Sequence, residues 1–390
     1  MKNILFDIIS AQGYVNGGGE YVNKVFTSLL ERLKQNSSPY TIYCLYDSKL
    51  RFVYPESTPD ALKKLPYVEF VDIQNHSLER IISEKNISTF FIGIAQRYGE
   101  FDFSNIQCRV VMVIHDLFDY EQDLNHVTDY IQSYYTKTFR LKRRIVKVRD
   151  FLLMRKIRKN GLGNLIEYLK NNSNYTIVAV SNYTKHSLMH YLPIKEEHIR
   201  VLYSPKKITI RNEKIENELL AKVINNKEKY FLTVSANSPT KNAIKAINAF
   251  NDFVKIYDIK DIKMVTIGFK SKTSKQHVDL PFLSKSDLEN TFKNAFALIY
   301  PSLFEGFGYP PIEAMKYGTP VAASNVCSMP EVLGDAPAYF SPIYETDFIK
   351  AYKNIYEYRD KYAEKALERY QFVNNKQKED LDSLIHLILS

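Results

Sequence analysis

Two glutamates separated by seven residues lie in the stretch 300–320, which reads YPSLFEGFGYPPIEAMKYGTP. Glu305 is expected in a loop after a buried strand, and Glu313 in the first turn of a helix over 311–316. Carboxylates such as these can accept hydrogen bonds from hydroxyl groups, for example those of a sugar. The alternative is that Glu313 only favours the helix dipole and that Glu305 is a solvated loop acid.

The loop between these glutamates contains Gly306, Phe307 and Gly308. Glycine allows the backbone to approach a ligand closely. Prolines at the start of the expected helix and Gly318 after its end are typical of helix boundaries. The amino end of this helix then points back at the loop, which predicts a site for a phosphate group.

A second glycine cluster contains Gly17 and Gly18 and lies between an expected strand over 3–9 and an expected helix over 20–33. The GxGxxG spacing of dinucleotide-binding loops is absent. The cluster is either a flexible turn or a ligand loop. We favour the ligand loop, because three consecutive glycines weaken a fold that gains nothing from them.

His115 ends an expected strand over 110–114. A lone histidine at such a place is more often a hydrogen-bonded structural residue than a catalytic one, so the residue alone favours a structural role. Ser181, Asn182 and Thr184 follow another expected strand and are interpreted as helix-capping residues.

The elements that must position these residues alternate along the chain. Short apolar runs without polar alternation are separated by segments of helical period, which indicates parallel sheets covered on both faces. The expected strands are 3–9, 41–45, 89–94, 110–114, 176–180, 230–234, 263–267, 297–300 and 320–323, and the expected helices are 20–33, 78–84, 127–169, 242–257, 285–294 and 311–316. This α/β pattern runs twice and predicts two doubly wound Rossmann-like domains that face each other across a cleft.

Composition excludes several classes of protein. Apolar residues make up 45% and charged residues 25% of the 390 residues, which excludes a disordered or coiled-coil chain. No apolar run reaches the roughly 20 residues of a membrane-spanning helix, and the amino-terminal residues form an expected strand rather than a signal peptide. Three scattered cysteines predict neither a disulfide framework nor a zinc site, so a cytoplasmic location is expected.

The net charge of +9 comes from one segment. Residues 137–159 carry eleven lysines and arginines and one aspartate, so the remaining 367 residues sum to −1. Interleaved apolar residues favour an amphipathic helix that contacts an anionic membrane or a lipid-linked acceptor. A solvated helix face is the alternative, and nucleic-acid binding is disfavoured because no recognition motif is present. The predicted contact residues are Arg140, Lys142, Arg143, Arg144 and Lys147.

The stretch 300–320 and its continuation to 336 closely resemble the E-x7-E region of retaining glycosyltransferases of family four, which have the GT-B fold. The segments 113–117, 178–184, 231–234 and 241–242 also resemble that family. The resemblance is strongest over 230–342. It implies an amino-terminal acceptor-binding domain over 1–204, a nucleotide-sugar-binding domain over 205–365, and a helix over 366–390 that packs back on the first domain.

The resemblance also implies roles for individual residues. Glu313 would accept hydrogen bonds from the ribose of the donor nucleotide, and Glu305 would hold hydroxyls of the transferred sugar. Lys241 would pair with the diphosphate, and His115 would lie near the donor sugar. The donor-binding residues carried over in this way are Gly17, Gly18, Lys241, Phe282, Leu283, Glu305, Gly306, Phe307, Gly308 and Glu313, and the catalytic ones are Glu305, His115 and Lys241.

One departure from the family pattern concerns the phosphate site. Family members usually carry an arginine beside this lysine or a few residues before it, whereas Thr240 precedes Lys241 here and 235–239 contain no arginine. Threonine cannot make the bidentate phosphate contacts of arginine. No metal-ligand cluster is evident, so neither a metal nor another cofactor is expected.

The expected function is therefore transfer of a hexose-type sugar, with retention, from a nucleotide-diphosphate sugar to a glycan or lipid-linked acceptor. The family suggests bacterial surface-polysaccharide assembly at the inner face of the membrane, with no nucleic-acid partner. The alternatives are a sugar-nucleotide epimerase or a sugar-phosphate synthase on the same fold, or a nucleotide-binding module without turnover. The presence of Glu305, Lys241 and Glu313 argues against a binding module without turnover.

Overall fold

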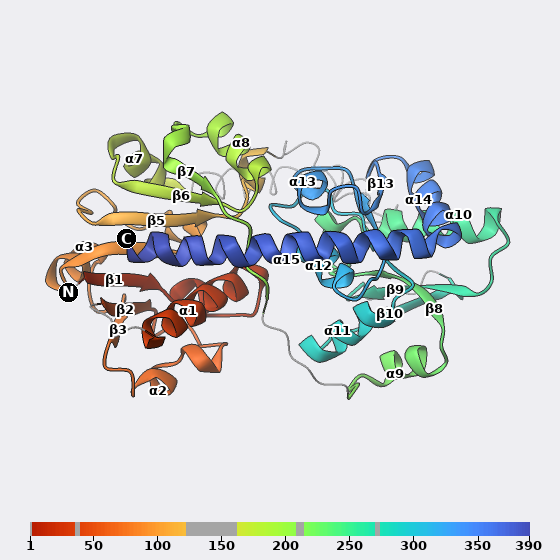
Figure 1. Cartoon of the computed structure of the whole chain (residues 1–390), viewed down its shortest axis with the longest axis horizontal. Helices are drawn as coiled ribbons and strands as arrows, with labels where there is room; N and C mark the ends of the chain where they lie inside the picture. Colours follow the sequence, from red (N-terminus) through yellow and green to blue (C-terminus); the bar gives the residue numbers. More distant parts are fainter. Residues whose placement is uncertain (1, 36–39, 122–161, 208–213, 270–273) are drawn as a thin grey trace, which may run out of the picture. The chain divides into compact units, whose positions relative to one another are not determined.

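The computed structural model describes residues 2–35, 40–121, 162–207, 214–269 and 274–390. These residues fall into two compact units. The first unit contains the described residues up to 207 together with Lys376–Ser390, and the second contains residues 214–375. Red to yellow-green colours mark most of the first unit in Figure 1, and green to blue mark the second.

The first unit contains a parallel sheet of seven strands in the order β3-β2-β1-β4-β5-β6-β7. The chain starts in the middle of this sheet, moves outward to β3 and then returns to the other side of β1. The strands are β1 (Lys2–Asp7), β2 (Tyr40–Tyr46), β3 (Val68–Asp72), β4 (Ile87–Ile92), β5 (Arg109–Ile114), β6 (Tyr175–Ala179) and β7 (Ile199–Val201). The described helices are α1 (Gly17–Gln35), α2 (Pro59–Leu62), α3 (Leu78–Glu84), α4 (Phe118–Glu121), α7 (Gly163–Asn171) and α8 (Asn182–Tyr191).

The second unit repeats this topology with six parallel strands in the order β10-β9-β8-β11-β12-β13. The strands are β8 (Lys229–Thr233), β9 (Ile262–Ile267), β10 (His277–Leu280), β11 (Ala297–Tyr300), β12 (Val321–Ser324) and β13 (Ala338–Phe340). The helices are α9 (Glu218–Asn225), α10 (Ala243–Ile256), α11 (Lys285–Asn294), α12 (Tyr309–Met315), α13 (Met329–Leu333), α14 (Glu345–Glu357) and α15 (Arg359–Leu389), of which α15 ends in the first unit. The predicted fold class, two Rossmann-like α/β domains, is confirmed.

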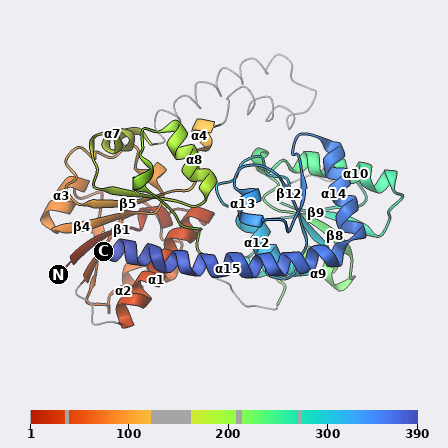
Figure 2. The same cartoon turned by 45° about the horizontal axis from the view of Figure 1, so that its top comes forward.

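Burial on both faces explains the apolar strands that lack polar alternation. In β5, Val110, Met112 and Ile114 join the main apolar cluster of the first unit, while Val111 and Val113, which point to the opposite face, are equally buried. In the second unit, α10 and α14 pack side by side (Figure 2), and the hydroxyl of Tyr352 donates to the carbonyl of Ala246 at 2.9 Å.

The last part of α15 is fixed to the first unit by hydrogen bonds. The Asp380 carboxylate accepts from the Tyr203 N–H at 2.7 Å, and the Gln377 amide donates to the Ser204 carbonyl at 2.7 Å. The Arg109 guanidinium donates to the Leu387 carbonyl at 2.6 Å. No helix among the described residues is both long and apolar enough to span a bilayer.

Candidate functional site

The carboxyl edge of the second sheet brings together two loops from neighbouring strands. The strand order reverses between β8 and β11, and ligands of doubly wound sheets bind at such a switch point. The loop after β8 ends in a short 3-10 helix, Pro239–Lys241, and the loop after β11 contains Glu305. The Leu303 N–H donates to the Thr240 carbonyl at 2.9 Å, so the backbone joins the two loops directly.

Lys241 and Glu305 form an ion pair between these loops, and the hydroxyl of Tyr300 donates to the same carboxylate oxygen. The Lys241 side chain is 22% exposed and that of Glu305 is 13% exposed. The ammonium group also lies 5.5 Å from the centre of the Tyr300 ring. The structure therefore places two of the predicted catalytic residues in contact at the switch point.

Tyr300 acts as a neutral hydrogen-bond donor to this carboxylate. Burial raises the pKa of Tyr300 well above its ordinary value, and the nearby charges of Glu305 and Glu313 raise it further. Tyr300 was not among the site residues predicted from the sequence. Its signal was its place at the end of an apolar strand, five residues before Glu305.

Asn242 explains why Lys241 points at the loop of Glu305. Its backbone is left-handed, with φ of 53°, which asparagine tolerates better than most residues. Its side-chain amide is buried and donates to the Pro342 carbonyl at 3.1 Å. This bond fixes the turn between the 3-10 helix and α10, and therefore the direction of the preceding lysine.

In the described part of the second unit, no arginine takes the place of the one absent beside Lys241. Thr240 places its hydroxyl 2.9 Å from that of Ser238. In the described part of the second unit, the arginines are Arg359, which donates to the Phe296 carbonyl, and Arg369, which donates to the Glu331 and Val332 carbonyls. Lys241 is the cation that the structure places at the switch point.

The glycine loop turns sharply into α12. Gly308 has φ of 85°, and an added Cβ would lie 2.2 Å from the Met329 side chain, so this glycine is required by the fold. Phe307 is buried and packs edge-on against Tyr309 at 5.4 Å. The backbone carbonyl of Glu305 accepts from the Ser328 hydroxyl at 2.9 Å, a supporting contact that the sequence analysis did not find.

Helix α12 starts two residues earlier than the sequence indicated. It runs from Tyr309 to Met315, so Glu313 lies in its second turn rather than in the first. The expected position of Glu313 in the first turn is therefore wrong, and the alternative of a helix-dipole role loses its support, because that effect is confined to the terminal turn. Glu313 is half-buried and close enough to influence the Tyr300 hydroxyl.

Phe282 stands at the same edge of the sheet, in the loop between β10 and α11. It is 67% exposed, which is unusual for a phenylalanine. Its ring covers Gly268, at the end of β9, where an added Cβ would lie 3.3 Å from the ring. The neighbouring Leu283 is half-buried. An exposed ring in this position offers one face for stacking.

The glycine cluster of the first unit is helical rather than a loop. Helix α1 begins at Gly17, and the Asn16 side chain accepts from the Gly19 N–H at 2.8 Å. A Cβ on Gly18 would lie 2.6 Å from the Ile94 side chain, whereas nothing lies within 4 Å of one on Gly17. Gly18 therefore packs closely against the Ile94 side chain, which gives this glycine a structural use, whereas the structure shows no such contact at Gly17.

His115 lies at the carboxyl end of β5 and is half-buried. Its Nε2 lies 3.0 Å from the Gly93 carbonyl, and its ring packs edge-on against Tyr21 at 4.8 Å. Burial lowers the pKa of His115 to about 4, so the ring is neutral at pH 7. The residues Arg140, Lys142, Arg143, Arg144 and Lys147 lie outside the described part of the chain.

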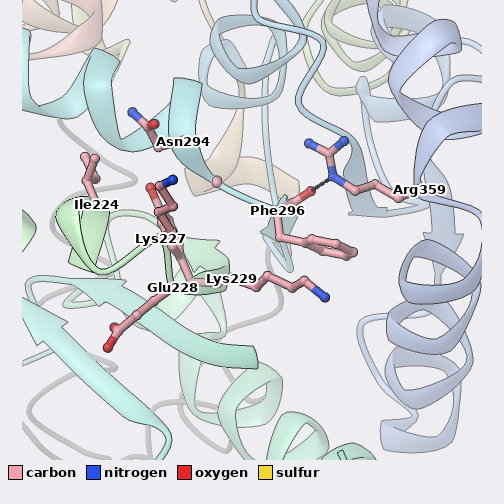
Figure 3. A pocket seen from close by; sticks show the side chains of 9 residues that line it. Ile224, Lys227, Glu228, Lys229, Asn294, Phe296 and Arg359 are labelled. Atoms are coloured by element: carbon pink, nitrogen blue, oxygen red, sulfur yellow. Dashed lines mark hydrogen bonds between the residues drawn. The ribbon is translucent and has the colours of Figure 1, made fainter. Parts of the chain in front are cut away.

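A pocket of about 430 Å³ lies at the opposite, amino edge of the second sheet (Figure 3). Lys229 at the start of β8, Phe296 before β11 and Arg359 line it, together with Ile224, Lys227, Glu228, Tyr230, Asn294 and Ala295. None of the predicted site residues belongs to it. Within the described ranges, no group of three or more His, Cys, Asp or Glu side chains could hold a metal ion.

The second unit matches a known family. Residues 214–368 match the family model of glycosyl transferases group 1. The O-antigen chain mannosyltransferase RfbU of Salmonella typhimurium is 31% identical over 215 residues, which cover 52% of this chain and 57% of that protein. O-antigen chain mannosyltransferase B of Escherichia coli is 46% identical over 63 residues, 16% of each chain. The chain thus matches only about half of the first relative's length and less of the second.

Solved structures share the fold over the whole chain. Anabaena HepE in complex with UDP and glucose has a TM-score of 0.62 at 13% identity, and covers 100% of this chain and 99% of its own. WaaG, a glycosyltransferase involved in lipopolysaccharide biosynthesis, has a TM-score of 0.57 at 12% identity, and covers 98% and 99%. The match of residues 214–368 to this family model confirms the predicted family resemblance, and the likeness to these solved structures confirms the GT-B fold.

Proposed function

We propose that this chain transfers a hexose, most simply mannose, from a nucleotide-diphosphate sugar to a glycan or lipid-linked acceptor, with retention of configuration. The observation that carries the proposal is the Lys241–Glu305 pair at the switch point of a group 1 domain. Two relatives named O-antigen chain mannosyltransferases support mannose and a setting in bacterial surface-polysaccharide assembly.

Lys241 is proposed to stabilise the leaving diphosphate. Negative charge grows on that group as the bond to the sugar breaks, and a fixed cation stabilises charge most effectively where it develops. In the structure the ammonium group of Lys241 forms an ion pair with Glu305. A bound diphosphate would form a second ion pair with the same ammonium group. Because the structure describes no arginine at this edge, Lys241 carries more of this role than it would beside an arginine.

Glu305 is proposed to bind hydroxyls of the transferred sugar. Tyr300 donates to one carboxylate oxygen, which leaves the second oxygen available to accept from a hydroxyl group. We do not assign Glu305 the nucleophilic role of a glycosidase carboxylate, because its ion pair with Lys241 serves binding and orientation instead. Glu313 is proposed to accept from the ribose hydroxyls, and Phe282 to stack on the base.

The transfer is proposed to need no metal ion or other cofactor. The segment 137–159, with Arg140, Lys142, Arg143, Arg144 and Lys147, is proposed to bind the anionic inner face of the cell membrane or the lipid-linked acceptor. Co-sedimentation with phosphatidylglycerol vesicles tests this, with phosphatidylcholine vesicles as the control. Loss of binding when the five residues are changed to glutamine would support the role, and equal binding to both vesicle types would contradict it.

Transfer from labelled donors tests the proposed function. The purified chain is incubated with GDP- and UDP-linked mannose, glucose or galactose, with octyl mannoside or a bacterial lipid extract as acceptor. Labelled glycoside formed from one donor, with the anomeric configuration retained, would support the proposal. An isomerised nucleotide sugar formed from donor alone would indicate an epimerase, and nucleotide binding without any product would indicate a binding module.

A further inference from the structure

A buried carboxylate occupies the switch point of the first sheet. Asp7 ends β1 and is 0% exposed. One of its oxygens accepts from the Ser10 N–H at 3.0 Å and from the Tyr98 hydroxyl at 2.6 Å, and the other accepts from the Gly93 N–H at 3.0 Å. Gly93 directly follows β4, so Asp7 joins the ends of the two strands between which the sheet order reverses.

Gly93 transmits this contact to His115. An added Cβ on Gly93 would lie 2.2 Å from the Val22 side chain, so the peptide sits against α1 in a place that only glycine fits. The Gly93 carbonyl lies 3.0 Å from His115 Nε2. The peptide group of Gly93 is therefore held by Asp7 on its amide side and holds His115 on its carbonyl side.

The carbonyl contact determines the tautomer of His115. A carbonyl oxygen only accepts hydrogen bonds, so Nε2 must carry the hydrogen. In a neutral imidazole, Nδ1 is then left with its lone pair. The edge-on contact with Tyr21, at 4.8 Å and 89°, further restricts the orientation of the ring. His115 therefore offers an acceptor at Nδ1 and not a donor.

We propose that Asp7 is a positioning residue, which fixes the Gly93 peptide so that His115 offers Nδ1 as an acceptor to a hydroxyl of a sugar substrate. The sugar contact rests on the proposed function, whereas the Asp7–Gly93–His115 chain does not. Without the carboxylate, the Gly93 amide loses its acceptor and the peptide can rotate. The carbonyl then no longer selects one tautomer, and His115 can present an N–H where the sugar hydroxyl needs an acceptor.

The test measures the tautomer directly in the full chain labelled with 15N-histidine. Long-range 1H–15N spectra at pH 7 report which ring nitrogen carries the hydrogen, and His115→Gln assigns the signal. We expect the Nε2–H tautomer in the wild type and a mixture or the Nδ1–H tautomer in Asp7→Ala. Tyr98→Phe is the matched control, because it removes a partner of the same carboxylate but leaves the oxygen that holds Gly93, and it should retain the wild-type spectrum.

Activity provides the second readout. Asp7→Ala should lower kcat/KM for transfer by about tenfold to a hundredfold through misplacement of His115, with unchanged affinity for the nucleotide alone. A folded Asp7→Ala with an unchanged His115 spectrum would overturn the proposal. If that variant does not fold, Asp7→Asn replaces it, because its single acceptor oxygen cannot satisfy both Gly93 and Ser10. A wild-type His115 with Nδ1–H, or charged at pH 7, would also overturn it.

The two proposals fail in different ways. If the wild type transfers no sugar but the spectra change as expected, the transferase proposal fails and the positioning role of Asp7 stands. If transfer occurs and Asp7→Ala leaves the His115 spectrum unchanged, the positioning role fails alone.

Discussion

The two sheets of this protein have the same strand order, apart from the additional edge strand β7 of the first sheet, but their switch points differ. In the second unit, the loops after β8 and β11 meet through the Lys241–Glu305 pair, whose side chains keep 22% and 13% exposure. In the first unit, the ends of β1 and β4 meet through Asp7, which is fully buried and bound by three donors. We call the edge with the partly exposed ion pair the exchangeable edge, because under the proposed function its charges exchange partners with a ligand. We call the edge with the buried carboxylate the locked edge, because Asp7 fixes the Gly93 peptide that contacts the His115 ring.

The largest expected effect is a loss of transfer activity when Glu305, at the exchangeable edge, is changed. Glu305→Gln should lower the rate of transfer by about a hundredfold or more, because the sugar loses a charged acceptor where positive charge develops. Transfer kinetics with the preferred donor measure this effect. Glu289→Gln is a matched control, because Glu289 also has a tyrosine and a lysine partner but does not lie at the switch point. It accepts from the Tyr317 hydroxyl at 2.7 Å and from the Lys316 ammonium group at 3.4 Å. Equal loss in both variants would contradict the role of Glu305.

The locked edge makes a prediction about pH. The pKa of His115 is lowered from 6.5 to about 4, so between these values the unfolded chain binds more protons than the folded one. Stability contributed by the neutral ring is present above pH 6.5 and is lost as the pH falls toward 4. At pH 5 the loss is about 2 kcal/mol, from the difference in proton binding at that pH.

Urea unfolding of the wild type and of His115→Gln at pH 7 and pH 5 measures this loss. The free energy of unfolding of the wild type should fall by about 2 kcal/mol more than that of the variant. Equal pH dependence in both proteins would show that His115 is not held neutral by burial. The description of the edge of the first sheet as locked would then be wrong.

Phe282 tests whether the exchangeable edge binds a nucleotide base. Phe282→Ala should weaken nucleotide binding by about tenfold, because stacking of an aromatic ring on a base contributes about 1–3 kcal/mol. Stability should change little, since the ring is mostly exposed. Calorimetric titration measures the affinity, and Phe372→Ala removes another exposed phenylalanine of the same unit as the control. Unchanged affinity in Phe282→Ala would exclude stacking on this ring.

The smallest expected effect is on removal of metal ions. If Lys241 and the backbone stabilise the diphosphate, then an excess of EDTA should leave the transfer rate unchanged. Restoration of lost activity by added Mg²⁺ or Mn²⁺ would show that the exchangeable edge also needs a cation.

Much of the fold was predictable because buried parallel strands lack polar alternation. The expected helices over 78–84 and 285–294 agree with α3 and α11, and most expected strands lie within two residues of those observed. Strands β3, β7, β10 and β13 were not predicted. All four lie at sheet edges and carry exposed or half-buried residues, so their apolar signal is weak.

Site residues could be predicted from the sequence where they belong to a local motif. They could not be predicted where their role depends on packing between distant segments. Glu305, Lys241 and the glycine loop follow from a local motif. Ser328 and Asp7 act through contacts with segments that are distant in sequence, which no local pattern displays, whereas Tyr300 lies only five residues before Glu305 and was overlooked. The contact of Gly18 with the Ile94 side chain was missed for the same reason, because the two residues are distant in sequence.

The most direct measurement of the central claim is calorimetric titration with UDP, GDP, ADP and CDP. The wild type, Glu313→Ala and Glu305→Ala are compared. The account predicts that one nucleotide binds, that Glu313→Ala weakens it by about tenfold or more through loss of a charged hydrogen bond, and that Glu305→Ala leaves it nearly unchanged. Equal weakening by both variants, or binding of none of the four nucleotides, would contradict a donor site at the switch point of the second sheet.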